Sequence, residues 1–159
     1  MLVSAKSIAV VPVAGVGMTS TELAALAPLD DAVRASVARD GVTLQSKEQT
    51  SAALSSARAA GVLCSLADDA CWKKAAALCD VDVLLVPSAA PRQGGDVALV
   101  VTIVDVAHAA QRVAGVIARD QIAARTKELV DDAFARLAAA TAPIDAPPID
   151  APPIDAPPI

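Results

Sequence analysis

Residues 81–88 have the sequence Val-Asp-Val-Leu-Leu-Val-Pro-Ser, the most apolar strand-length stretch of the chain. Every position from Val81 to Val86 except Asp82 is apolar. Strict alternation would indicate a strand with one solvated face, whereas a nearly continuous apolar run is typical of a strand that is buried on both faces. We therefore expect this stretch to be the central strand of a sheet that helices cover on both sides.

Strand and helix patterns alternate on the N-terminal side of this stretch. A β-branched apolar run and a shorter one predict strands, and apolar residues at helical spacing predict the helices between them. Thr19 with Glu22, and Ser46 with Gln49, have the spacing of capping boxes at helix starts. These patterns predict strands over 7–13 and 42–45 and helices over 19–27, 29–39, 46–60 and 67–79.

Two strands and one helix are predicted on the C-terminal side. The strands, Asp96–Val104 and Gln111–Arg119, are separated by short turns and therefore form an antiparallel meander with the central stretch. Apolar residues recur at three and four positions from Ile122 to Leu137, which predicts a long amphipathic helix. The order β-α-β-α-α-β-β-β-α predicts an α/β (α+β) fold with one mixed, five-stranded sheet.

The last residues of the sequence differ in composition from the rest. From Ile144 the unit Ile-Asp-Ala-Pro-Pro repeats, and it ends on Ile159. Proline removes backbone donors and forces the preceding residue into extended geometry, so neither a helix nor a sheet is expected. We expect a single domain over 1–141 and a disordered tail over 142–159. A ligand for a proline-recognising domain and a linker to a further part of the protein are the alternatives for the tail.

Deleting residues 143–159 is expected to leave the melting temperature of the domain essentially unchanged. A donor-poor repeat has no amphipathic face to bury, so its removal exposes no core. Thermal unfolding of the full and truncated chains, followed by circular dichroism, measures the effect. A fall of more than a few degrees would show that the tail docks on the domain.

Composition excludes several classes of protein. The chain has a net charge of -5, a single Trp, a single Phe and no Tyr, so it offers neither a basic surface nor aromatic platforms for nucleic acids. Its apolar stretches are strand-length, so no transmembrane segment is expected. The N-terminal residues lack the pattern of a signal peptide, which indicates a cytoplasmic chain unless a leader precedes Met1.

Two features invite a catalytic or ligand-binding interpretation, and both are weak. Gly15 and Gly17 follow a predicted strand and precede a helix, but Ser20 occupies the third position of the dinucleotide-binding pattern. The loop is a weak ligand candidate. His108 lies in a predicted turn, where it is expected to be solvated, and Asp105 beside it has no nucleophile motif to serve. We expect no catalytic residues, no cofactor and no enzyme activity.

Three pairs of neighbouring carboxylates lie on predicted helices, at 30–31, 68–69 and 131–132. Adjacent helical residues point about 100° apart, so the members of a pair do not converge on one substrate. Pairs near a helix start are also favoured by the helix dipole. We expect solvated or helix-capping roles for all three pairs.

The three cysteines are the most informative group. They have neither CxxC spacing nor a nearby His, so no zinc site is expected. Cys71 and Cys79 lie on one predicted helix, about 12 Å apart along its axis, too far to bond. Cys64 reaches Cys71 only if the helix begins late, near Ala67. A Cys64–Cys71 disulfide and buried reduced thiols both remain open, and Cys79 is expected in the core.

The chain resembles the small envelope domain shared by the TolB amino-terminal domain and CsgG-like proteins, in the form found in delta-proteobacterial periplasmic proteins and lipoproteins. The resemblance covers roughly residues 6–138. Its matching segments are 8–13, 29–39, 42–44 leading into 46–60, the Cys64 and Cys71 pair, 81–86, the glycines 94–95, and 101–105.

This resemblance implies a function in addition to a fold. Such domains are not known as enzymes and act in envelope assembly and protein–protein contact. It therefore implies a non-catalytic interaction or assembly module with a protein partner, located in the periplasm or cell envelope. A cytoplasmic small-ligand-binding or regulatory domain is the alternative that the Gly15–Gly17 loop and the missing leader favour.

Overall fold

The computed structural model of the chain describes residues 6–39 and 41–141, and the predicted tail over 142–159 lies outside them. The described strands form one six-stranded mixed sheet, with β3-β1-β4-β5-β6 as its order and β2 paired to β4. β1 runs parallel to β3 and β4, and β4, β5 and β6 form an antiparallel meander. The strands are β1 (Lys6–Val10), β2 (Ala14–Gly15), β3 (Val42–Leu44), β4 (Val83–Pro91), β5 (Val97–Asp105) and β6 (Gln111–Ile117).

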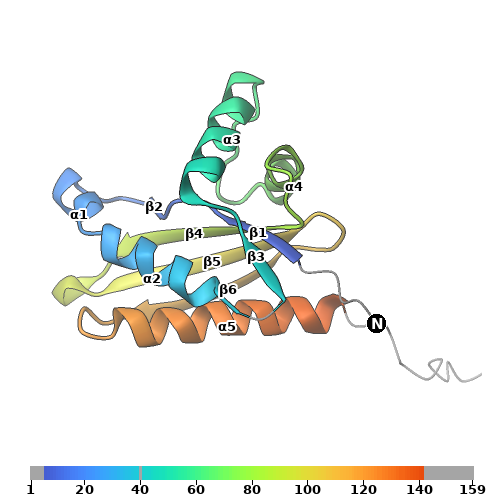
Figure 1. Ribbon diagram of the computed structural model, residues 1–159. Helices are drawn as coiled ribbons and strands as arrows, with labels where there is room; N and C mark the ends of the chain where they lie inside the picture. The colour runs from blue at the N-terminus through green and yellow to red at the C-terminus, as the bar shows by residue number, and fades with distance from the viewer. Residues whose placement is uncertain (1–5, 40, 142–159) are drawn as a thin grey trace, which may run out of the picture.

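Helices cover both faces of this sheet (Figure 1). On one face α2 and α5 pack against each other and against the meander, and on the other α3 and α4 lie above the central strands. The helices are α1 (Ser20–Ala24), α2 (Ala27–Val37), α3 (Lys47–Ala59), α4 (Asp69–Leu78) and α5 (Ile122–Thr141), with a short 3-10 turn η1 (Gln93–Gly95) between β4 and β5. The predicted mixed α/β fold is confirmed. Within the described residues, no helix is long and apolar enough to cross a membrane.

β4 is the central strand, as its apolar run predicts, although it begins at Val83 rather than Val81 and continues to Pro91. Leu84 belongs to the apolar layer that includes Trp72 and Ala76 of α4, whereas Leu85 belongs to the layer on the opposite face that includes Val33 of α2 and Val130 of α5. Both leucines are fully buried. Successive side chains of a strand point to opposite faces, so a strand covered on both sides must be apolar at nearly every position.

The first strand differs from the prediction of a continuous run over 7–13. It ends at Val10, and the chain pairs with β4 again only at Ala14–Gly15, which form β2. Two prolines explain the gap, because Pro12 and the neighbouring Pro87 of β4 both lack a backbone donor. The interruption adds the sixth strand and leaves Pro12 at the carboxyl end of β1.

Two of the predicted helix starts agree with their local signals, and two are displaced. Both predicted capping boxes form, Thr19 with Glu22 and Ser46 with Gln49. The helix predicted over 29–39 begins earlier, because Pro28 occupies its first turn, where a missing donor costs nothing. α4 begins at Asp69, two residues later than predicted.

Candidate functional site

A crevice lies at the carboxyl ends of the parallel strands β1 and β3. The chain leaves β1 toward α2 on one face of the sheet and leaves β3 toward α3 on the other. Ligands of open α/β sheets typically bind at such a switch point, because the two departing connections separate there. The crevice has a volume of about 530 Å³, and it is the principal candidate site of the described chain.

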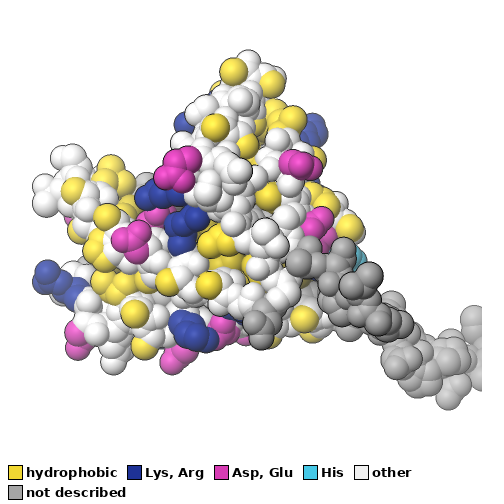
Figure 2. Space-filling view, viewed as in Figure 1, with side chains coloured by type: hydrophobic (Ala, Val, Ile, Leu, Met, Phe, Trp, Pro, Cys, Tyr) yellow, Lys and Arg dark blue, Asp and Glu magenta, His cyan; other side chains and the backbone are white. Residues whose placement is uncertain are grey.

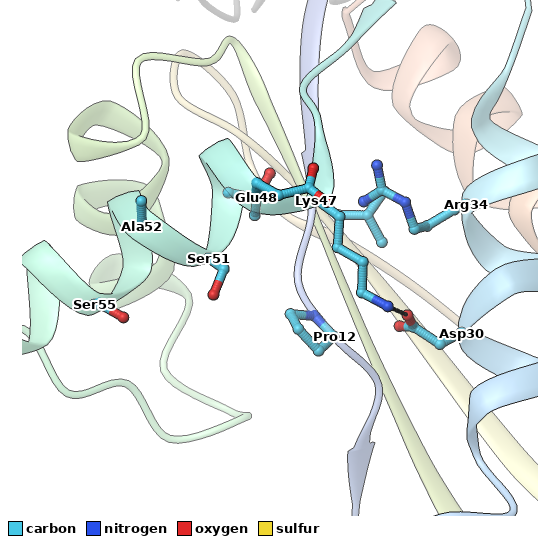
Figure 3. A pocket seen from close by; sticks show the side chains of 10 residues that line it. Pro12, Asp30, Arg34, Lys47, Glu48, Ser51, Ala52 and Ser55 are labelled. Atoms are coloured by element: carbon cyan, nitrogen blue, oxygen red, sulfur yellow. Dashed lines mark ion pairs between the residues drawn. The ribbon is translucent and has the colours of Figure 1, made fainter.

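The walls of the crevice come from α2 and α3, and Pro12 lies between them (Figure 3). Asp30 and Arg34 project from α2, and Lys47 extends across from the first turn of α3 toward Asp30. The α3 wall continues with small and hydroxyl side chains: Ser51, Ala52 and Ser55. Figure 2 shows basic side chains gathered in the hollow between α2 and α3, with acidic side chains around them.

Asp30 joins three segments of the chain at the crevice. Its Oδ1 accepts a hydrogen bond from the Val13 amide at 3.1 Å, and its Oδ2 lies 3.5 Å from the Lys47 ammonium. The expectation of a solvated role for this carboxylate is wrong, because Asp30 is buried. Its partners are 17 residues apart from it in either direction, so no local pattern identifies them.

A polar network backs the crevice. Arg34 donates from Nη2 to the Gln45 carbonyl at 3.1 Å. The Gln45 side chain donates in turn to the Cys79 carbonyl and accepts from the buried Thr50 hydroxyl, each at 2.9 Å. The network holds Arg34 in place. Arg34, Lys47, Ser51 and Ser55 all line the crevice and offer it hydrogen-bond donors. Such a lining suits a small polar ligand that carries acceptor oxygens.

The Gly15–Gly17 loop does not line this crevice. Gly15 belongs to β2, and a Cβ atom there would lie 2.3 Å from Cδ2 of Leu23, so a larger residue would displace the Leu23 side chain of α1. The ligand interpretation of the loop stays a prediction.

Cys64 and Cys71 form a disulfide, with their Cα atoms 5.4 Å apart. The late start of α4 makes the bond possible. Asp68 is the N-cap and accepts from the Cys71 amide at 3.1 Å, so Cys64 remains in the preceding loop. Trp72 fixes the same loop by donating from its indole to the Ser65 carbonyl at 3.0 Å. Cys79 is free and buried, as expected, and burial raises the pKa of its thiol.

Asp105 and His108 interact at the turn between β5 and β6. The sequence predicts a solvated histidine there and does not predict this contact. His108 Nδ1 lies 3.1 Å from Asp105 Oδ1, which also accepts from the Ala107 amide at 2.8 Å. Lys6 approaches Oδ2 at 3.2 Å. Burial by itself raises the pKa of Asp105, but the bonds from Ala107, His108 and Lys6 outweigh it and hold the pKa below its usual value.

The Asp105→Asn variant is expected to be less stable than the parent near neutral pH by about 1–3 kcal/mol, the range for disrupting a buried charge-assisted cluster. Because the folded-state pKa is lowered, the stabilisation is present above the unfolded-state pKa of about 3.9 and is lost as the pH falls through the folded value. The difference between variant and parent should therefore shrink below about pH 4. Urea unfolding across this range measures it, with the exposed Asp120→Asn as the matched control. A difference that is constant with pH would contradict the interpretation.

The other two carboxylate pairs lie at the surface, and some of their members form ion pairs there. Asp68 caps α4, as expected near a helix start, but Asp69 pairs with Arg112 of β6. Asp131 pairs with Arg39 at 2.7 Å and with Lys127, and the hydrogen bond from Lys127, followed by that from Arg39, lowers the pKa of Asp131 against the effect of burial. The side chains of Asp69 and Asp131 are 37% and 41% exposed, so these ion pairs lie on the solvated surface, in agreement with the expectation. Among the described residues, no group of three or more His, Cys, Asp and Glu side chains is placed to hold a metal ion.

Comparisons with known proteins show a likeness of fold. No protein-family model matches the sequence, and a search of curated proteins finds no match. The structure is similar to the LpoB C-terminal domain from Salmonella enterica, with 18% identity and a TM-score of 0.50 over 73% of this chain and 84% of that chain. A PelC dodecamer structure from Paraburkholderia phytofirmans shares 12% identity and a TM-score of 0.43, over 86% of this chain and 89% of that chain. At this identity the likeness to the LpoB domain concerns the fold alone, and the specific TolB and CsgG resemblance stays a prediction.

Proposed function

We propose that this protein is a non-catalytic interaction or assembly module that works in the cell envelope. The observation that carries the proposal is the Cys64–Cys71 disulfide. Disulfides form and persist in oxidising compartments such as the periplasm, whereas the cytosol keeps thiols reduced. The fold likeness to the LpoB C-terminal domain and the sequence resemblance to envelope domains are consistent with this location.

The disulfide also supports a role in protein contact. It braces the loop between α3 and α4, and Leu63, next to Cys64 on this loop, is 75% exposed. An aliphatic side chain held in water on a rigid loop loses little conformational freedom when a partner covers it. The loop therefore offers a preorganised contact point.

The proposal is tested by trapping thiols in cells that express the protein from its own gene. Cells are quenched in acid, denatured and treated with a maleimide that adds visible mass to each free thiol. One modification, at Cys79, is expected. The Cys64→Ser variant is the matched control and should show two, because it frees Cys71. Three modifications in the parent would place the protein in a reducing compartment and contradict the envelope function.

A second candidate function, binding of a small polar ligand, is favoured by the crevice between α2 and α3. Arg34 and Lys47 present cationic donors there, and they suit an oxyanion. Inorganic phosphate should then raise the melting temperature of the parent and of Arg58→Gln, an exposed control on α3, more than that of Arg34→Gln. Equal shifts in all three proteins would exclude the crevice as an oxyanion site.

A further inference from the structure

A second, smaller cavity lies at the end of the sheet where α1 meets α2 and where α5 begins. Its volume is about 290 Å³. Aliphatic side chains from four elements line it: Leu26, Leu29, Val97, Ile117 and Ile122. Three of these belong to the buried core, so the floor of the cavity is continuous with the packed interior. The cavity is therefore a preformed apolar pocket.

Arg119 is the one charged residue of this lining. No hydrogen bond or ion pair within the described residues engages its side chain. Arg119 thus places an unpaired guanidinium beside an aliphatic cavity.

Gly95 positions this arginine. It lines the same cavity, and a Cβ atom there would lie 2.6 Å from Cδ of Arg119. Its φ of +83° is also one that side-chain-bearing residues rarely adopt. The aliphatic stem of Arg119 therefore lies directly against the backbone of the turn between β4 and β5, beside the pocket that both residues line.

We propose that this pocket, the aliphatic cavity with Arg119 beside it, binds the C-terminus of a partner protein that ends in Leu, Ile or Val. The terminal side chain fills the cavity, and the free α-carboxylate accepts from the Arg119 guanidinium. A planar guanidinium matches a carboxylate with two parallel hydrogen bonds, which explains the preference for an anionic end group. The inference rests on the proposed interaction function and names the part of the partner that is recognised.

Size and charge favour a peptide terminus over a lipid. A volume of about 290 Å³ is at the lower end for ligand pockets and suits one or two aliphatic side chains rather than a long acyl chain. The net charge of -5 also disfavours approach to an anionic membrane surface.

The test uses the full chain and the peptide acetyl-Ala-Ala-Ala-Leu, either with a free carboxylate or as the C-terminal amide, in calorimetric titrations. The free acid should bind at least ten-fold more tightly than the amide. Arg119→Gln should lose at least ten-fold in affinity for the acid and little for the amide. Arg119→Lys keeps the positive charge but cannot form two parallel hydrogen bonds, so its affinity for the acid should lie between those of the parent and of Arg119→Gln. Arg58→Gln, on the opposite side of the sheet, is the matched control and should bind like the parent.

Equal affinity for acid and amide, or unchanged binding by Arg119→Gln, would overturn the proposal. Octanoate is titrated in parallel, and tighter binding of octanoate than of the peptide acid would assign the pocket to acyl chains and also overturn it. The outcome is separable from that of the proposed function. If the peptide does not bind but Cys64 and Cys71 are bridged in cells, only this inference fails. If the peptide binds but all the thiols are free in cells, only the envelope location fails.

Discussion

The Leu84→Asp variant is expected to lose cooperative folding. Leu84 is 0% exposed in the central strand and packs against α4 and the neighbouring strands. A carboxylate at this position has no cationic partner within the packed layer, and burying an unpaired charge costs more than about 4 kcal/mol. Small domains are stable by about 5–15 kcal/mol, so this loss removes most or all of the stability.

Urea unfolding followed by circular dichroism and tryptophan fluorescence measures the loss, because Trp72 packs in the same apolar layer. The control is Val116→Asp on β6, where the parent side chain is 44% exposed and a carboxylate remains solvated. The control should unfold cooperatively near the parental midpoint. A Leu84→Asp protein that unfolds at the same urea concentration as the control would mean that β4 is not buried on both faces.

Removing the disulfide is expected to have the second largest effect. In the chain-entropy model, a bond between cysteines seven positions apart stabilises the folded state by about 2.5 kcal/mol. The Cys64→Ser, Cys71→Ser double variant should therefore melt well below the parent, by roughly ten degrees for a domain of this size. Reductant should lower the melting temperature of the parent toward that of the variant and leave the variant itself unchanged.

This design separates the bond from the side chains. If reductant shifts both proteins equally, the effect is not due to the disulfide. If neither the substitutions nor reductant changes the melting temperature, the loop between α3 and α4 is not constrained by the bond, and the structural argument for a rigid contact at Leu63 fails.

The carboxylates show where local sequence stops being informative. Asp68 caps a helix start, a role that depends on residues within one turn, and it could be predicted from position alone. The residues next to Asp105 in sequence are ordinary turn residues and give no sign that this carboxylate is paired. Its ion-pair partner, Lys6, lies 99 residues away in sequence. That pairing exists because the sheet order brings the start of β1 near the end of β5.

The disulfide could be predicted only in part from the sequence. Both cysteines are visible in the sequence, but the choice between a bond and free thiols depends on whether α4 begins before or after Asp68. Ser65 and Asp68 are both acceptable N-caps by residue type. The indole of Trp72, which donates to the Ser65 carbonyl, ties that segment to the packed loop outside the helix. Tertiary packing therefore decided a question that two local signals left open.

The sequence by itself determined the element order apart from β2, the central position of the strand that begins at Val83, and both capping boxes, because burial periodicity and capping are read over a few neighbouring residues. Only the tertiary structure decided the crevice at Asp30, Arg34 and Lys47 and the apolar pocket at Arg119. Each of these sites is assembled from elements that are distant in sequence. The geometry of both sites depends on which face of the sheet each connection crosses and on which strand it then joins. The hydrophobic periodicity of a single helix or strand does not encode either of these.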